Sequence, residues 1–478
     1  MVFIFQKKKK KSTDSKNNYN KRDEGEIIME NKKSIDMLNG SIVNKLLLFA
    51  LPLAASSILQ QLFNAADVAV VGNFAGGEAL AAVGANGSVI NLLVNLFVGL
   101  SIGTNVVVAS FIGQKDDKRT SQAVHTSLLL SFISGVVLLV VGVLFARPIL
   151  EIMSTPEDII DLATLYLQIY FAGMPFIMLY NFTSAILRSK GDTKRPLLSL
   201  LISGTINIIL NLFFVIVCHM SVEGVAIATV ISNVISSLML VYFLMHETDA
   251  LKVDFKSLHI HKDILIKIAK IGVPAGLQST VFSISNVIIQ IALNDLGSAA
   301  VAASAAALNY EYFTYFVISA FSQAAVTFIG QNYAAHQYER CQKITKWTLL
   351  LSSLSTLAVS FIFIILHVVC IGFFTSDLEI AKLAYTRMYI VLSFQIINMV
   401  IELLSGFLRG IGYSSIPALV CVLGICGTRI IYIYTIYPSI ASYNHLLMIY
   451  PISWIITALA LTFIYMIIHK RAYLINKS

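Results

Sequence analysis

The chain has 478 residues, of which 57% are hydrophobic and 13% are charged, and its formal net charge is +8. A soluble globular domain carries about 25% charged residues, so this composition excludes an ordinary soluble domain and predicts a protein that mostly faces lipid. The five cysteines show no CxxC-type spacing and therefore indicate neither a disulfide framework nor a metal centre.

A polar, basic segment, 1–42, precedes the first apolar stretch and lacks the apolar core of a cleavable signal peptide. Its lysine run, 7–11, favours a cytoplasmic tail at the lipid surface. Met29 opens a short polar lead into the first stretch, so the sequence leaves both Met1 and Met29 open as the natural start.

Twelve apolar stretches follow, each long enough to cross a ~30 Å hydrocarbon core. Their length and continuity predict transmembrane helices rather than barrel strands, and hence an all-α integral membrane protein. The predicted N-lobe, 43–245, contains the stretches 43–71, 80–112, 123–145, 159–186, 196–217 and 222–245. After a cytoplasmic linker, 246–263, the predicted C-lobe, 264–468, contains 264–293, 299–329, 344–371, 381–408, 416–436 and 446–468, and 469–478 forms a second tail.

The two lobes carry the same landmarks in the same order, each returning roughly 220 residues later. The repeated pairs are Pro52 and Pro274, Phe111-Ile112-Gly113-Gln114 and Phe328-Ile329-Gly330-Gln331, Leu187-Arg188 and Leu408-Arg409, and Gly204-Thr205 and Gly427-Thr428. Because each lobe has an even number of helices, both lobes enter the membrane in the same orientation. We therefore predict two homologous six-helix lobes related by a pseudo-twofold axis along the membrane normal, an architecture typical of transporters.

The basic charge follows the predicted topology. Of the 34 lysines and arginines, all except Arg147, Lys382, Arg387 and Arg429 lie in the two tails or in the loops and helix ends after even-numbered helices. The positive-inside rule then places both termini in the cytoplasm, and we expect a multi-pass protein of the cell membrane. The basic excess is explained by topology and gives no reason to expect nucleic-acid binding.

Asp67 is the sharpest candidate for a functional group. It lies late in the first predicted helix, on one face with Ser57, Gln60 and Asn64. An ionisable group inside the bilayer is costly, which makes it a functional candidate. The alternative is a helix that ends earlier and leaves Asp67 at the water boundary, but the apolar run that follows, 68–71, favours the buried position.

Two further groups of polar side chains lie inside predicted helices. Asn207 and Asn211 lie one turn apart in the fifth helix; they can ligate a cation, bond a buried carboxylate, or join helices. In the C-lobe the polar residues are Asn286, Gln290, Glu311, Asn398 and Glu402. Each acid can carry a proton, attract a cationic substrate or form a structural ion pair, and these alternatives remain open.

The buried cations are expected to be few. We place Arg188 and Arg409 at cytoplasmic helix ends rather than among substrate ligands, which leaves Arg429 as the one clear mid-helix cation. A nucleotide-binding GxxxxGK[ST] loop, an HExxH zinc motif and a GxSxG elbow are all absent from the sequence. We therefore expect no cofactor and no enzyme activity, and uphill transport would have to use an ion gradient.

These features resemble the multidrug and toxic compound extrusion (MATE) transporters over residues 45–470. The resemblance rests on the twelve helices in two repeats, the segment from Pro52 to Asp67, and the repeated Gly-Gln and Leu-Arg-x-x-Gly landmarks. It implies a V-shaped pair of lobes that expels cationic amphipathic compounds in exchange for H⁺ or Na⁺. It also implies that Asp67, where Na⁺ would bind, works with Asn207 and Asn211, and that Thr229 and Asn181 add polar groups to this site.

One departure concerns the coupling acids. The family branch that includes the DNA-damage-inducible members usually has Asp where this chain has Asn211. The other large bacterial branch accepts Asn there and pairs it with acids in the seventh and tenth helices. Here the seventh helix has no acid, and the matching position in the tenth is Asn398, with Glu402 one turn later. This difference leaves the coupling ion, H⁺ or Na⁺, open.

The functional hypothesis is a monomeric, cation-coupled antiporter of small organic cations that works by alternating access between the lobes. Gln60, Asn64 and the polar residues of the C-lobe are expected to line the substrate cleft. One rival is a lipid-linked oligosaccharide flippase of related architecture, which would need several cations lining the cleft. The other is a membrane-embedded enzyme, for which the sequence offers no paired catalytic constellation.

Overall fold

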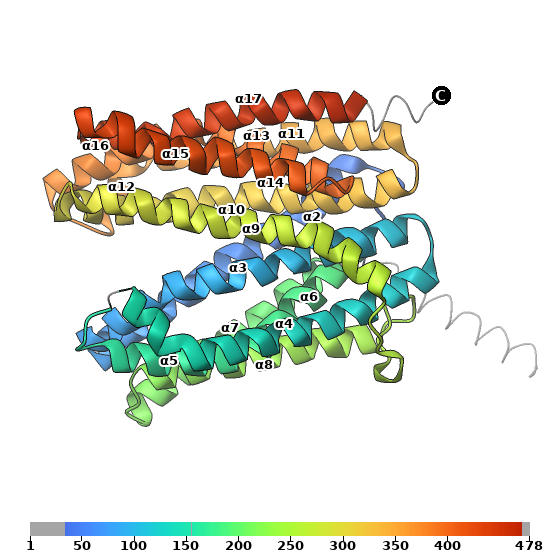
Figure 1. The fold of residues 1–478 in the computed structure, drawn as a ribbon, viewed down its shortest axis with the longest axis horizontal. Helices are drawn as coiled ribbons and strands as arrows, with labels where there is room; N and C mark the ends of the chain where they lie inside the picture. Colours follow the sequence, from blue (N-terminus) through green and yellow to red (C-terminus); the bar gives the residue numbers. More distant parts are fainter. Residues whose placement is uncertain (1–33, 154, 471–478) are drawn as a thin grey trace, which may run out of the picture.

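The computed structural model describes residues 34–153 and 155–470, and within them every regular element is a helix. Eleven helices are long and apolar enough to cross a membrane, and one bent pair supplies a twelfth span when it is counted as one. The helices form two bundles, seen as the lower and upper halves of Figure 1. The expected all-α, two-lobe fold is confirmed.

The N-lobe follows the predicted helices closely. Its elements are α2 (Ile42–Val70) with the π-helical turn η1 (Val71–Ala75), α3 (Gly77–Gly113), α4 (Asp117–Ile152), α5 (Ile160–Ala172), α6 (Met174–Lys190), α7 (Lys194–Leu212) with η2 (Phe213–Val217), and α8 (Val222–Met245). The fourth predicted helix is divided into α5 and α6, which meet at 47°. Pro175 explains the break, because a proline inside a helix removes a backbone donor and clashes with the preceding turn.

The C-lobe repeats this plan with more irregular helices. Its elements are η3 (Phe255–Ser257) in the linker, α9 (Lys262–Asn294), α10 (Ser298–Ala334), α11 (Tyr338–Ile365), α12 (His367–Gly372), α13 (Leu378–Gly410), α14 (Ser415–Cys421), η4 (Val422–Gly427), α15 (Thr428–Ile431), η5 (Tyr432–Ile436), η6 (Tyr437–Ser439), α16 (Tyr443–Leu447) and α17 (Ile449–His469). The eleventh predicted helix thus carries π-helical turns, which commonly mark strained or functional segments.

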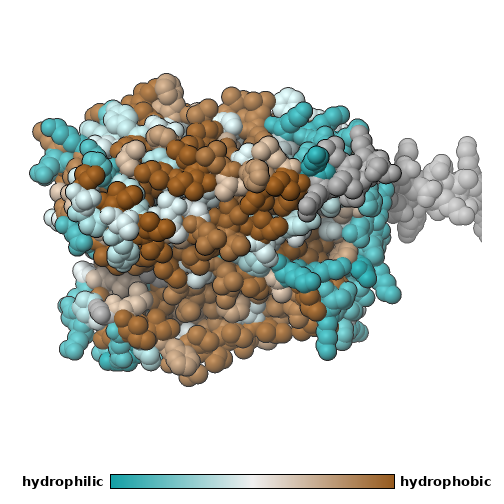
Figure 2. All heavy atoms as spheres, turned by 45° about the horizontal axis from the view of Figure 1, so that its top comes forward, coloured by the Kyte–Doolittle hydropathy of each residue, from teal (hydrophilic) through white to brown (hydrophobic). Residues whose placement is uncertain are grey.

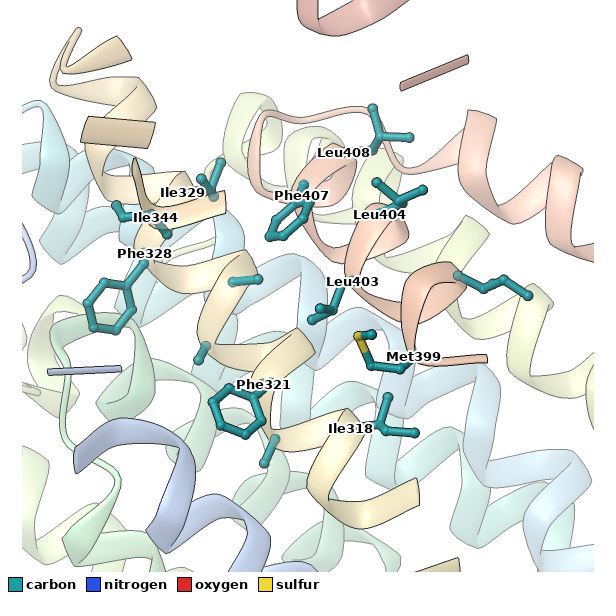
Figure 3. Packing of buried hydrophobic residues seen from close by; sticks show 14 of the residues in the cluster. Ile318, Phe321, Phe328, Ile329, Ile344, Met399, Leu403, Leu404, Phe407 and Leu408 are labelled. Carbon is teal, nitrogen blue, oxygen red and sulfur yellow. The ribbon is translucent and has the colours of Figure 1, made fainter. Parts of the chain in front are cut away.

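The first helix of each lobe packs partly into the other lobe. The first half of α2, including Leu46 and Phe49, belongs to the core cluster of α10, α11 and α13, whereas its end joins the N-lobe core at Val70. Conversely, Ile264 and Ile268 at the start of α9 lie in an N-lobe cluster. Figure 3 shows the C-lobe side of this packing, where side chains of α10 and α13 face one another. The division at residues 43 and 264 therefore describes the repeat but not the packing of these two helices.

The lobes meet through two pairs of glycines. Gly99 and Gly103 of α3 lie directly against the backbone of Gly272 and Gly276 of α9, with no room for a Cβ atom. Small residues spaced by four let helix backbones approach closely in a membrane, where packing rather than the hydrophobic effect drives association. The Gly-x-x-x-Gly pattern of α3 thus has a matching partner in the other lobe.

The described chain begins and ends at the same end of the molecule (Figure 1). At that end, Gln331 of α10 donates to the backbone carbonyl of Ser189 at 2.6 Å, and Thr327 donates to Asn105 Oδ1 at 3.0 Å. Figure 2 shows a broad apolar band across both lobes, hydrophilic residues at the two ends, and a recess between the lobes at the end away from the termini. We call the two ends the closed end and the open end.

The segment before α2 straps the two lobes together at the closed end. The backbone N–H of Ile35 donates to Gly191 of the N-lobe at 3.4 Å. On the other side, the Arg340 guanidinium donates to the carbonyls of Met37, Asn39 and Gly40 at distances between 2.9 and 3.2 Å. The strap and the glycine contacts fix the relative position of the lobes at this end.

Candidate functional site

Asp67 lies inside the N-lobe and is held by side chains from two other helices. Asn211 of α7 donates from Nδ2 to Asp67 Oδ1 at 2.5 Å, and Thr229 of α8 donates from Oγ1 to Oδ2 at 3.4 Å. Asn207, one turn before Asn211, joins the same network through Thr229 Oγ1 at 3.5 Å. Four of the five residues predicted for the coupling site are therefore brought together.

Close packing between α2 and α7 explains how these residues meet. Gly204 of α7 lies against the ring of Phe63 in α2, and a Cβ atom at Gly204 would overlap that ring. Asp67 follows Phe63 by one helical turn, and Asn211 follows Gly204 by two turns. The glycine thus lets the two helices approach closely enough for the carboxylate and the amide to bond.

The site presents oxygen atoms suited to a small hard cation. Asp67, Asn207, Asn211 and Thr229 each contribute a side-chain oxygen, and Asn211 Oδ1 is buried without a hydrogen-bond partner among the described residues. Oxygen ligands of this kind suit Na⁺, while the carboxylate alone can accept a proton. Residues 34–153 and 155–470 contain no cluster of three or more His, Cys, Asp or Glu side chains that could hold a metal ion.

Asn181, the fifth predicted member, takes no part in this network. Its Nδ2 donates to the carbonyl of Ile177 in its own helix at 2.9 Å. Asn181 instead lines a central cavity of about 290 Å³ between the lobes. The resemblance places Asn181 in the coupling site, and the packing of α6 turns its side chain toward the cavity instead.

The central cavity takes its lining from both lobes. Its residues come from α2, α3, α6, α7, α9, α10 and α13, and include Gln60 and Glu402, as predicted for a substrate cleft. The other predicted cleft residues lie elsewhere. Asn398 bonds Gln395 within α13 at 3.0 Å, Gln290 bonds Asn294 within α9 at 2.8 Å, and Asn64 is exposed outside this cavity.

Glu311 is a structural ion-pair partner rather than a cleft residue. It accepts two hydrogen bonds from Arg387, at 2.6 and 3.0 Å, and both side chains are buried inside the C-lobe. Arg387 and Arg429 both lie against the ring of Tyr450, with the guanidinium carbons 5.2 and 4.9 Å from the ring centre. Arg429 also donates to Asn286 Oδ1 at 3.1 Å, so Asn286 belongs to this cluster as well.

Arg387 is the charged residue that the sequence interpretation undervalued. The sequence predicts Arg429 as the one clear mid-helix cation, yet Arg387 is also buried, with 2% exposure. The sequence contained one indication of this position. Arg387 lies far from every predicted cytoplasmic loop and is one of the four exceptions to the positive-inside pattern.

Arg188 and Arg409 lie in the last turn of their helices, α6 and α13, as predicted. The structure adds that both side chains line the central cavity, which the sequence did not indicate. The sequence of a helix end does not show whether its arginine faces a cavity, because the packing of the other lobe decides which side chains are enclosed.

A protein-family model, MatE, matches the chain twice, over residues 52–213 and 274–435. The two matches coincide with the two halves of the sequence repeat and together cover most of the chain. The chain is similar to the probable multidrug resistance protein YoeA of Bacillus subtilis, with 27% identity over 82% of this chain and 86% of that protein. It is also similar to the multidrug export protein MepA of Staphylococcus aureus, with 22% identity over 78% and 83% of the two chains.

Solved structures share the fold at low sequence identity. A transporter of the MOP superfamily from Pyrococcus furiosus, described as having a binding pocket of reverse polarity, superposes with a TM-score of 0.85 at 21% identity, over 92% of this chain and 98% of that chain. A multidrug resistance MATE family transporter in an outward-facing conformation gives the same values.

Proposed function

The chain belongs to the MatE family, and on that premise we propose that it is a cation-coupled antiporter of the cell membrane that exports amphipathic organic compounds, organic cations among them. The relatives YoeA and MepA carry the names of multidrug resistance and multidrug export proteins, which supports a broad, small-molecule cargo. By the positive-inside rule, the closed end, where the described chain begins and ends, faces the cytoplasm, and the conformation is outward-open in this proposal. We propose that the transporter acts as a monomer.

The observation that carries the coupling role is the half-buried carboxylate of Asp67, held by Asn211 and Thr229. A charged carboxylate inside a membrane bundle is energetically unfavourable, and protonation or cation binding would reduce that cost. Either event changes the bonds that join α2 to α7 and α8. The coupling ion, H⁺ or Na⁺, can thereby alter the shape of the N-lobe.

Substrate binding takes place in the central cavity, where Glu402 supplies a carboxylate for a cationic group and Gln60 and Asn181 supply hydrogen bonds. Because α2 contributes both Gln60 to the cavity and Asp67 to the coupling site, a movement of this helix links the two. Alternating access then requires the glycine contact between α3 and α9 to open while the open end closes.

Transport into proteoliposomes tests this proposal directly. A fluorescent cationic dye is accumulated or expelled under an imposed proton gradient, an imposed sodium gradient, or neither. We expect one gradient to drive transport by the purified protein, and Asp67→Asn to abolish it while the thermal unfolding temperature stays close to that of the wild type. Asn73→Ala is the control, since this exposed side chain only donates to the carbonyl of Ala69.

Undiminished, gradient-driven transport by Asp67→Asn would exclude Asp67 as the coupling group. Dye transport that responds to neither gradient would exclude antiport altogether, and would point to a facilitated or flippase-type mechanism.

A further inference from the structure

The charges that line the central cavity are mostly positive. Of its lining residues, Arg188, Glu402 and Arg409 are the charged ones, two cations against one anion. In a pocket that bound only organic cations, a guanidinium from each lobe would repel the ligand. The excess cation therefore needs an explanation beyond export of positively charged compounds.

The two arginines occupy equivalent positions in the sequence repeat. Leu187-Arg188 ends α6 in the N-lobe, and Leu408-Arg409 ends α13 in the C-lobe. Both side chains line the same cavity, one from each lobe. A ligand bound between them would touch both moving bodies of the transporter.

Neither guanidinium is neutralised by an ion pair within the described part of the chain. All ion pairs within 4.0 Å there involve other cations. Arg409 is 8% exposed and donates to Gln278 Oε1 at 2.7 Å, but its Nε–H is buried without a partner. The Arg188 guanidinium has no hydrogen-bond partner among the described residues.

The buried Arg387 of the C-lobe contrasts with Arg409, which is buried without an ion pair among the described residues. Arg387 is satisfied by Glu311 through two hydrogen bonds. Buried charges are normally paired, because leaving one unpaired costs several kcal/mol. An arginine fork with free donors is suited to a planar carboxylate or to a phosphate.

The rest of the cavity is largely apolar or neutral. Its apolar lining includes Leu53, Val98, Ile102, Ala275 and Phe282. Glu402 lies about two helical turns before Arg409 on α13. A ligand with an apolar body, a compact anionic group and a separate cationic group would match all three kinds of lining.

We propose that Arg188 and Arg409 form an anion subsite in the central cavity, and that the exported molecules include amphipathic zwitterions or anions carrying a carboxylate or phosphate. This proposal rests on the proposed export function for its transport step, but the binding step stands on the cavity alone. Both lobes hold the same anionic group, so its release would accompany their separation.

A matched pair of dyes tests the subsite. One is a cationic xanthene dye with a free carboxylate, and the other is its methyl ester, which differs only in lacking the anion. Binding of each dye to the purified protein in nanodiscs is measured by fluorescence anisotropy. We expect the carboxylate dye to bind about tenfold to a hundredfold more tightly, the range of a charge-assisted hydrogen bond.

Four variants locate the effect. Arg188→Gln and Arg409→Gln should each reduce the preference for the carboxylate dye while leaving binding of the ester unchanged. Arg188→Lys keeps the charge and should retain part of the preference. It replaces Arg188→Gln as the test variant if that protein does not fold. Arg119→Gln, at an exposed position of α4, is the matched control and should bind both dyes as the wild type does.

Equal affinity for the two dyes in the wild type, or a carboxylate preference that survives replacement of both arginines, would overturn the proposal. Transport of the ester dye in proteoliposomes is read separately. A wild-type protein that exports the ester dye but shows no carboxylate preference counts against the subsite alone. A wild-type protein that shows the preference but does not export the ester dye counts against the export function alone.

A competition experiment distinguishes a free amphipathic anion from a lipid headgroup as the natural ligand of the subsite. The bound carboxylate dye is challenged with a soluble aryl carboxylate and with a short prenyl pyrophosphate. Displacement by the carboxylate alone identifies a free amphipathic anion, and displacement by the prenyl pyrophosphate at lower concentration identifies a lipid headgroup. Displacement by neither would overturn the subsite.

Discussion

Gln331 of the C-lobe donates a hydrogen bond to the backbone carbonyl of Ser189 in the N-lobe at 2.6 Å, and its side chain is 3% exposed. Its counterpart in the sequence repeat, Gln114, is exposed and bonds only Ser110 in its own helix, at 3.2 Å. The two equivalent glutamines therefore differ: Gln331 bonds across the lobes and Gln114 faces solvent, although Gly113 beside it lies against the backbone of Gln331. The bond between Gln331 and Ser189 belongs to this conformation alone, because it must break when the closed end opens.

Replacing Gln331 should shift the balance between the two transport states. Gln331→Ala removes one buried hydrogen bond, worth about 1 kcal/mol, and should raise the ratio of open to closed forms at this end about fivefold. Spin labels at the exposed positions Lys118 and Lys343, one in each lobe, should then show a larger fraction of long distances. Gln114→Ala is the matched control, and an equal shift in that variant would contradict the assignment.

Much of the architecture could be predicted from the sequence. Apolar length gives the helices with small errors at their ends, and the predicted range 222–245 matches α8 in full. Only the family resemblance implied that Asp67, Asn207 and Asn211 work together, whereas each of them could be recognised as a polar residue inside an apolar run. Such features depend on local sequence and on the cost of polar groups in lipid, which a single chain displays.

Contacts between the lobes could not be predicted in the same way. Arg188 and Arg409 read as helix-end residues, and only the docking of one lobe on the other encloses their side chains in a cavity. The pairing of Arg387 with Glu311 joins positions 76 residues apart, on helices whose rotation the sequence does not specify. Sequence periodicity identifies the polar face of a helix but not the element that the face meets.

The glycine contact between α3 and α9 should be highly sensitive to added volume. In Gly103→Ala the new methyl group would press on the carbonyl of Ile268 and the backbone of Gly272. Overpacking of this kind typically costs about 1–3 kcal/mol, so we expect a lower unfolding temperature and a shift toward separation at the closed end. Thermal unfolding and the same spin-label distances measure both effects.

Gly84→Ala provides the comparison within the same helix. No atom lies within 4 Å of a Cβ placed at Gly84, and alanine is the better helix former by up to about 1 kcal/mol. That variant should therefore be neutral or slightly stabilising. A Gly103→Ala protein as stable as Gly84→Ala would show that the lobes do not depend on this close approach.

The buried pair of Glu311 and Arg387 should contribute to stability rather than to transport selectivity. Glu311→Gln leaves the Arg387 charge without its partner, and breaking a buried pair costs about 3–5 kcal/mol. The double variant Glu311→Gln, Arg387→Met removes the orphaned charge and should recover part of the loss. Thermal unfolding of both variants in nanodiscs is the measurement, and a double variant less stable than Glu311→Gln would contradict the pairing argument.

The two hydrogen bonds to Asp67 should contribute unequally to ion coupling. Asn211→Leu removes the closer donor, which stabilises the charged carboxylate of Asp67. If the coupling ion is H⁺, protonation becomes easier and the half-maximal proton concentration should fall about tenfold to a hundredfold, the range for a bond to a charged group. If the ion is Na⁺, the loss of Asn211 Oδ1 as a ligand should instead raise the half-maximal sodium concentration.

Thr229→Val removes a donor at 3.4 Å while keeping the volume, so its effect should be several times smaller. Ion-dependent dye transport in proteoliposomes measures both values, with Asn73→Ala again as the control. An equal shift in the Thr229 and Asn211 variants would contradict the unequal roles of the two bonds. For Na⁺, a larger effect at Asn211 than at Thr229 places the ion between α2 and α7, where the unpartnered Oδ1 of Asn211 is available as a further ligand.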